Sequence, residues 1–151
     1  MKTNTPVITG IGVVTSSSVG LQAFHDSLSA SKRMLQPIAE AECDIFQGLQ
    51  AALLHLDAET YLGKKGLRTL DKASKAALVA SHLAIEHANL QSTLPTTTGV
   101  VLACTSGCLS AKGEFDRDTL KTGPAFVNPA LFPYCVFNTQ TAHIAMRFHA
   151  T

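Results

Sequence analysis

Two long apolar runs in the chain predict buried β-strands. Residues 7–14 are mostly β-branched and lie between Pro6 and a run of three serines, and residues 99–104 follow a short stretch rich in threonine. A strand that is covered on both faces is apolar at consecutive positions, whereas a half-exposed strand alternates apolar with polar positions. Both runs therefore predict strands in the interior of a sheet.

Helical spacing of apolar residues is found between the two runs. After Gly20, apolar residues recur at positions i, i+3 and i+7, namely Leu21, Phe24 and Leu28. The longest predicted helix covers about residues 71–89 and begins at Asp71, a residue type that caps helix N-termini. Its many alanines predict that it packs very closely against other parts of the protein.

The rest of the chain is less regular. Residues 31–66 combine a proline with mixed charges and receive no assignment. Residues 108–120 are predicted to be helical, and residues 123–133, with their three prolines, are predicted to be an ordered loop. Helical spacing returns from about residue 135 to residue 148. The expected core anchors of this last helix are Val136, Ile144 and Phe148.

This order of elements predicts an α/β layered fold. Two strands make a poor sheet for so many helices, so the predicted sheet is incomplete. The length of 151 residues suits one compact domain, and 46% hydrophobic with 15% charged residues excludes a disordered chain. The formal net charge of +1 gives no electrostatic reason to expect nucleic acid or an anionic membrane as a partner.

The chain carries no pattern of a membrane span or an export signal. Polar residues and glycines interrupt the uncharged stretch 3–24, and its apolar part is too short to cross a bilayer. With Lys2 as the only preceding charge, this stretch also makes a poor signal peptide. The four cysteines form no CxxC pair and are expected to be reduced thiols. We therefore expect a cytoplasmic protein.

Two short motifs have a functional and a structural interpretation. Gly10 and Gly12 match part of a dinucleotide-binding turn, but Thr15 stands where the third glycine belongs. The structural alternative is that these glycines let a helix or a strand approach closely. Ser29 and Lys32 match the SxxK pattern of some acyl-enzymes without its companion motifs. The alternative there is the C-terminal end of a helix.

The sequence predicts no metal and no cofactor. His82 and His87 are five residues apart and do not share a helix face as a metal-binding i, i+4 pair would. Cys104 and Cys108 are four residues apart but lack the second ligand pair that a zinc site needs. Three acidic residues of the helix predicted at 108–120 are expected to form one solvated face: Glu114, Asp116 and Asp118.

Three segments together carry a family resemblance. The first is VITGIGVVT at residues 7–15, and the second is LDKASKAA at residues 70–77, which leads to a predicted strand beginning GVVL. The third is LFPY at residues 131–134, followed by Asn138 and His143. In this order and spacing they resemble the N-terminal half of a β-ketoacyl-acyl carrier protein synthase, a condensing enzyme of the thiolase-like superfamily. The resemblance covers nearly the whole chain.

The resemblance implies an α/β thiolase-like layered fold in which helices pack a mixed sheet. Residues 1–151 would form its incomplete N-terminal half. In the family this half continues into a strand and a turn that carries the nucleophilic cysteine, and two catalytic histidines follow later. None of the four cysteines matches that nucleophile: Cys43, Cys104, Cys108 and Cys135. We therefore expect the chain to end before the catalytic cysteine and to be inactive by itself, which the coding sequence beyond Thr151 would test.

The resemblance also gives roles to individual residues. Ser106 lies where the family places a side chain that gates the acyl pocket. Leu131 and Phe132 match residues that reach across the family's dimer interface and line the acyl tunnel of the partner. His143 is interpreted as structural. At Phe137 the sequence departs from the family, which more often has proline or a small residue there.

The implied activity is decarboxylative Claisen condensation in fatty acid or polyketide biosynthesis. The implied partners are an acyl carrier protein that carries acyl and malonyl groups, and a second subunit in a homodimer or in a ketosynthase/chain-length-factor heterodimer. The alternative is a non-catalytic subunit, similar to a chain-length factor, that shapes the acyl pocket in such a heterodimer.

Overall fold

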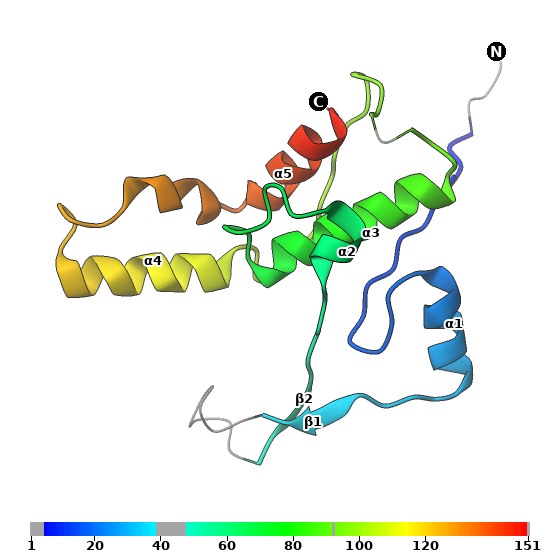
Figure 1. The fold of residues 1–151 in the computed structure, drawn as a ribbon, viewed down its shortest axis with the longest axis horizontal. Coiled ribbons are helices and arrows are strands. Elements are labelled where there is room, and N and C mark those ends of the chain that lie inside the picture. The colour runs from blue at the N-terminus through cyan, green and yellow to red at the C-terminus, as the bar shows by residue number, and fades with distance from the viewer. Residues whose placement is uncertain (1–4, 39–47, 92, 151) are drawn as a thin grey trace.

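A computed structural model describes residues 5–38, 48–91 and 93–150 of the chain. Its centre is the long helix α3 (Lys72–His87), against which α5 (Thr139–Phe148) and the short α2 (Ala58–Leu62) pack (Figure 1). The buried core lies between these three helices and the loop that joins α2 to α3. It consists of Ala58, Leu62, Leu67, Leu70, Leu78, Val79, Ile144 and Phe148.

Two parts of the chain extend away from this core (Figure 1). One is an arm in which α4 (Leu109–Thr122) lies beside the 3-10 helix Pro129–Tyr134. The rings of Phe115 and Phe132 meet edge to face at 6.2 Å and join these two helices. The other part contains α1 (Leu21–Ser29) and a two-stranded antiparallel sheet of β1 (Leu35–Pro37) and β2 (Gln50–Ala52).

The predicted helices are confirmed in position, with adjusted ends. The Asp71 side chain caps α3 by accepting a hydrogen bond from the Ser74 N–H at 2.7 Å. The prediction of a loop over residues 123–133 is wrong in its second half. There Asn128 caps a 3-10 helix whose first residue is Pro129. Proline is tolerated at the first position of a helix, because the N–H that it lacks would have no partner within the helix. The last helix begins at Thr139, later than predicted.

The prediction of two buried strands at residues 7–14 and 99–104 is wrong. Both segments are extended but join no strand pair, apart from one isolated bridge between Val14 and Val19. Ile8 is 84% exposed and Val101 is 98% exposed. A strand forms only where a second strand takes up its backbone hydrogen bonds, and the described part of the chain offers neither segment such a partner.

The segment 7–14 packs instead on α3. Gly10 and Gly12 lie directly on the helix backbone at the level of Ala80, Ala84 and Ala88. The prediction of very close packing by the alanines is confirmed, and so is the structural interpretation of the two glycines. The backbone N–H of Ile11 donates a hydrogen bond to His87 Nδ1 at 3.0 Å near the end of the helix.

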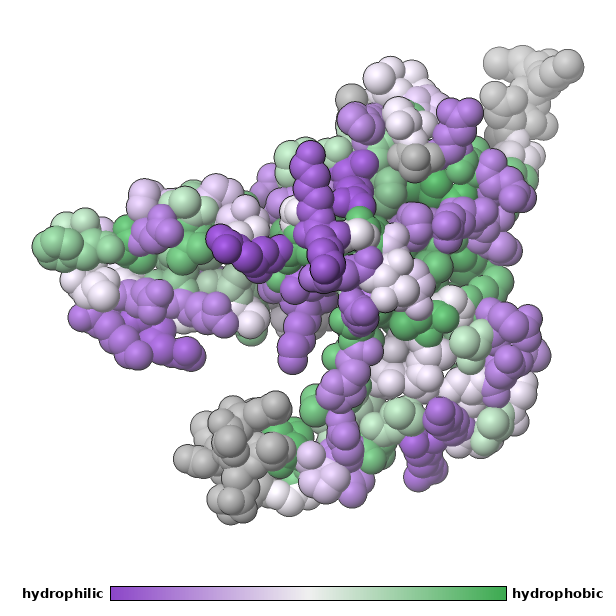
Figure 2. Space-filling model, in the orientation of Figure 1, coloured by the Kyte–Doolittle hydropathy of each residue, from purple (hydrophilic) through white to green (hydrophobic). Residues whose placement is uncertain are grey.

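Hydropathy is mixed over the surface. Figure 2 shows hydrophobic patches on the arm and beside α3, with strongly hydrophilic side chains gathered over the middle of the molecule. Among the described helices, none is both long and apolar enough to cross a membrane.

Candidate functional site

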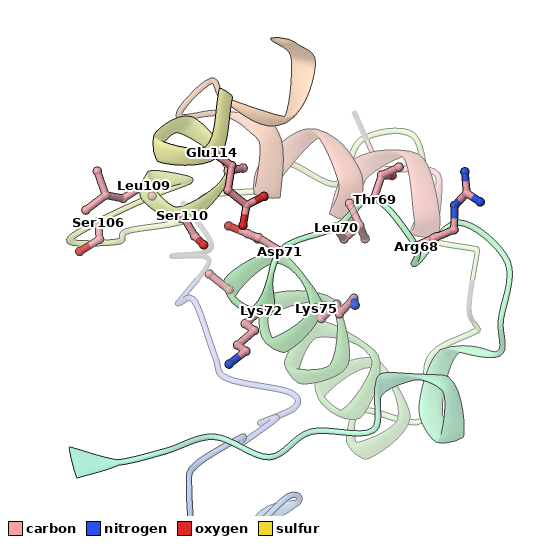
Figure 3. Close-up of a pocket in the computed structure, with 13 residues that line it drawn as sticks. Arg68, Thr69, Leu70, Asp71, Lys72, Lys75, Ser106, Leu109, Ser110 and Glu114 are labelled. Atoms are coloured by element: carbon pink, nitrogen blue, oxygen red, sulfur yellow. The ribbon is translucent and has the colours of Figure 1, made fainter. Parts of the chain in front are cut away.

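A cavity of about 550 Å³ lies between the N-terminal ends of α3 and α4 (Figure 3). Ser106, which the sequence predicts to line an acyl pocket, lies on its wall together with Leu109 and Ser110 at the start of α4. The opposite wall comes from residues 68–73 and from Lys75. The cavity therefore forms where the start of α4 passes the capped end of α3.

Charged groups dominate one side of this cavity. The carboxylates of Asp71 and Glu114 face each other from α3 and α4 (Figure 3). Asp71 already accepts a hydrogen bond as the helix cap, and Lys72 and Lys75 extend from the first turns of α3. Such a cavity can hold a polar group at its charged side and an apolar group against Leu70 and the start of α4.

The other two predicted site residues lie on the 3-10 helix of the arm. Leu131 lines a second cavity of about 290 Å³, and Glu114 and Arg68 line both cavities. The structure thus brings Ser106 and Leu131 to neighbouring cavities. Phe132 lines neither of them; its side chain is 58% exposed and touches Phe115.

A buried turn fixes the position of Ser106. Gly107 follows it with φ +53°, in the left-handed region that favours glycine. The carbonyl oxygen of Gly107 accepts a hydrogen bond from Gln140 Nε2 at 3.0 Å, and the ring of Phe137 lies against the glycine. Sequence reasoning missed Gln140. The sequence does contain a signal for this residue. Gln140 stands four residues before Ile144 and eight before Phe148, so a polar side chain falls on the apolar face of α5.

The described cysteines are free thiols with different surroundings. Cys104 is exposed, and Cys108 is buried at the N-terminal end of α4. The Cys135 thiol donates weak hydrogen bonds to the carbonyl oxygens of Leu131 and Ala111, and burial raises its pKa. A nucleophilic cysteine instead needs a lowered thiol pKa, commonly from a neighbouring histidine or cation. No hydrogen bond joins any of these three thiols to a histidine; Cys43 lies outside the described residues.

Two of the histidines contact neighbouring side chains, His143 an aromatic ring and His82 a carboxylate. His143 stacks on Tyr134 with ring centroids 5.7 Å apart, and burial lowers its pKa. His82 lies 3.3 Å from Glu86 one turn along α3. Within residues 5–38, 48–91 and 93–150, no three metal-ligating side chains come together. The acidic residues predicted on one solvated face of α4 are exposed, as expected.

Ser29 and Lys32 do not form a catalytic pair. Ser29 is the last residue of α1, and Lys32 lies just beyond its end, where its backbone N–H donates to the carbonyl of Ser27. Both side chains are exposed. The interpretation as a helix C-terminal end is therefore the correct one.

Comparison with solved structures defines the class of fold. The chain is similar to a structure described as the ishigamide ketosynthase/chain length factor, with a TM-score of 0.79 and 24% identity over 97% of this chain and 42% of that one. It is also similar to a β-ketoacyl synthase from Burkholderia phymatum, with a TM-score of 0.73 and 21% identity over 95% of this chain and 36% of that one. The chain thus shares the fold of these ketosynthase structures, as predicted.

Comparison of sequences then gives the family. Residues 4–151 match the family described as β-ketoacyl synthase, N-terminal domain, and the chain belongs to this family. It is 30% identical to a Streptomyces rimosus protein named as an oxytetracycline polyketide β-ketoacyl synthase, over 92% of this chain and 35% of that protein. It is 25% identical to the chloroplastic 3-oxoacyl-[acyl-carrier-protein] synthase I of Arabidopsis thaliana, over 93% of this chain and 31% of that protein. The chain spans about a third of the length of these relatives.

Proposed function

We propose that the chain is the N-terminal part of a β-ketoacyl-acyl carrier protein synthase that acts in fatty acid or polyketide biosynthesis. The observation that carries this proposal is the family match over residues 4–151. The two neighbouring cavities add support, because they lie beside the residues that the resemblance assigns to the acyl pocket, Ser106 and Leu131.

The proposed reaction is a decarboxylative Claisen condensation. A cysteine thiolate takes the acyl group from the carrier protein as a thioester and releases the carrier thiol, while an oxyanion hole holds the carbonyl oxygen. Two imidazoles favour loss of CO₂ from the malonyl unit, and the resulting carbanion attacks the acyl thioester, forming the C–C bond and breaking the C–S bond so that the cysteine thiolate leaves. The raised pKa of Cys135 and the burial of Cys108 do not suit the first of these roles. In this proposal residues 1–151 supply scaffold and pocket wall and do not condense acyl groups by themselves.

The test compares residues 1–151 with the protein encoded by the complete gene. Each is incubated with acyl-loaded carrier protein, and its intact mass is measured before malonyl-loaded carrier protein is added. We expect an acyl adduct and a β-ketoacyl product only with the complete protein. An acyl adduct on a cysteine of residues 1–151 would contradict the proposed division of roles. Lack of both adduct and product with the complete protein, with and without a ketosynthase subunit, would contradict the proposed reaction.

A second candidate function is that of a non-catalytic subunit that shapes the acyl pocket in a heterodimer, like a chain-length factor. The thiols favour it, because none of the three described cysteines forms a hydrogen bond with a histidine and burial raises the pKa of Cys135. Co-expression with a ketosynthase subunit separates the two functions. The second requires a stable heterodimer that condenses acyl groups although the complete protein forms no acyl adduct.

An acyl carrier protein is the proposed macromolecular substrate. Four cations near the loop between α2 and α3 are exposed and form no ion pair with another described residue: Lys64, Lys65, Arg68 and Lys72. A carrier protein that presents carboxylates would be attracted to this surface. Replacing Lys64 and Lys65 by glutamate should then raise the KM for acyl carrier protein and weaken the salt dependence of KM, with little change in kcat.

The exposed apolar residues of the arm support a proposed dimer. Phe132 on the 3-10 helix is 58% exposed, and Phe126, before that helix, is 81% exposed. Figure 2 shows a hydrophobic patch on the arm, and an exposed patch of this kind commonly marks an interface between subunits. Sedimentation of the complete protein, alone and with a ketosynthase subunit, would separate a homodimer from a heterodimer.

A cytoplasmic location is also part of the proposal. The described cysteines are free thiols, which suits a reducing compartment. Cell fractionation followed by immunodetection tests it, and recovery in an extracytoplasmic fraction would contradict it.

A further inference from the structure

The turn that carries Ser106 is closed by a hydrogen bond from the Leu109 N–H to the Ser106 carbonyl at 3.0 Å, and it has one buried part. From residue 101 to residue 110 only Gly107 and Cys108 are buried, while Ser106 and the residues before it are exposed. The conformation of Ser106 on the cavity wall therefore depends on what holds these two buried residues. Of these two residues, Gly107 has contacts to a segment that is distant in the sequence.

Gln140 in the first turn of α5 and Phe137, just before this helix, both contact Gly107. Gln140 is 2% exposed, and its Nε2 donates a hydrogen bond to the Gly107 carbonyl at 3.0 Å across 33 residues of sequence. On another side of the glycine, a Cβ added there would lie 2.8 Å from Cδ1 of Phe137. The positive φ of +53° excludes most side chains at this position in any case. The turn is thus held by a buried amide and covered by an aromatic ring.

The amide of Gln140 is used on one side only. Its Oε1 is buried and has no hydrogen-bond partner among the described residues. A buried acceptor without a donor is unfavourable, and native structures keep such groups rarely and for a reason. Here the Nε2 hydrogen bond to Gly107 is the interaction that the amide provides. A leucine would fill similar space without an unpaired acceptor.

Phe137 is 76% exposed, so core packing does not account for its size. One edge of its ring lies against Gly107, since a Cβ added to the glycine would be 2.8 Å from Cδ1 and 3.3 Å from Cε1 of Phe137. A smaller residue would leave the glycine turn open on this side.

We propose that Phe137 and Gln140 are positioning residues that fix Ser106 on the cavity wall and thereby help to select the acyl group. This inference rests on the proposed function, because it assigns the cavity of Ser106 to the acyl chain. It concerns selectivity between acyl donors, which depends on how the wall of a pocket fits each of them. Neither residue takes part in the bond-forming steps.

The test uses the complete synthase, or the heterodimer, that contains this chain. kcat and KM are measured for carrier proteins loaded with straight-chain acyl groups of increasing length. F137A and Q140L should each change the ratio of kcat/KM between long and short acyl groups by about tenfold, the size of effect that a small change in an apolar pocket produces. F137Y keeps the ring and should leave this ratio within about twofold of the wild type.

The matched control is L28A, which removes an exposed apolar side chain from α1, outside the cavity of Ser106 and outside the arm. It should leave the selectivity unchanged. Circular dichroism and the Tm of each variant show that it is folded; should Q140L be unfolded, F137A with its F137Y rescue decides the matter alone. An unchanged ratio in F137A, or an equal loss of activity for every acyl length, would overturn the inference. A wild-type synthase without condensing activity would instead contradict the proposed function, on which the inference depends.

Discussion

Gly12 lies so close to Ala80 that a Cβ built on the glycine would be 1.8 Å from the carbonyl oxygen of Ala80. At Gly10 the corresponding distance to the Ala84 carbonyl oxygen is 2.1 Å. Both neighbours are backbone atoms of α3, so they cannot rotate out of the way as the end of a side chain could. The extended segment therefore lies on α3 only because glycine stands at both positions.

Replacing Gly12 by alanine should destabilise the protein. The added methyl group must push the segment 7–14 away from α3, and overpacking of this kind costs about 1–3 kcal/mol or more. We expect a lower free energy of unfolding in a urea titration. The matched control is Gly113→Ala, because Gly113 is exposed inside α4 with no atom within 4 Å of an added Cβ. That change should stabilise the helix by about 0.5–1 kcal/mol. Equal stability of the two variants would contradict the packing argument.

Local signals in the sequence predicted α1, α3, α4 and α5, but not α2, which lies in the residues that received no assignment. Asp71 before a regular apolar spacing is enough to place the start of α3, because a cap and its helix form within one turn. Strands depend on partners that are distant in sequence. The run at residues 99–104 has the right composition, yet Val101 is 98% exposed, because no described strand pairs with it.

The site was also predicted only in part, because some of its contacts join residues that are distant in the sequence. The resemblance supplied Ser106 and Leu131, and both line cavities. The contact between Gln140 and Gly107 spans 33 residues, and no local pattern contains it. A polar residue on the apolar face of α5 is a signal, but it does not say which backbone group the amide reaches.

Removing the cap of α3 should weaken the fold measurably. Asp71→Ala leaves the Ser74 N–H without its partner, and loss of an N-cap costs about 0.5–2 kcal/mol. Asp71→Asn should keep most of the stability that Asp71→Ala loses, since asparagine caps helices as well as aspartate does. Asp118→Ala, on the exposed face of α4, should change stability by less than about 0.5 kcal/mol. Thermal unfolding followed by circular dichroism measures all three, and an unchanged Tm of Asp71→Ala would refute the role of the cap.

Protonation of His143 should lower stability in mild acid. Burial lowers the pKa of His143 below its ordinary value of 6.5, an effect that the charge of Asp71 partly offsets. Below pH 6.5 the unfolded chain therefore binds a proton that the folded protein does not, so the free energy of unfolding falls until the pH passes the folded pKa. His143→Phe, which keeps a ring to stack on Tyr134, should flatten this dependence in urea titrations at several pH values. His25→Gln is the control at an exposed histidine, and a flattening of the same size there would contradict the assignment.

Thiol labelling should follow the surroundings of the three described cysteines. Iodoacetamide reacts with the thiolate, so exposure and a normal or low pKa favour the reaction. Cys104 is exposed and should react first at pH 8. Cys135 should react more slowly, because burial raises its pKa and its thiol donates to two carbonyl oxygens. Cys108 is 2% exposed and should react only when the protein opens. Peptide mass spectrometry at timed intervals gives the order. Labelling of Cys135 ahead of Cys104 would indicate an activated thiol on the arm and would reopen the proposal that residues 1–151 carry no nucleophile.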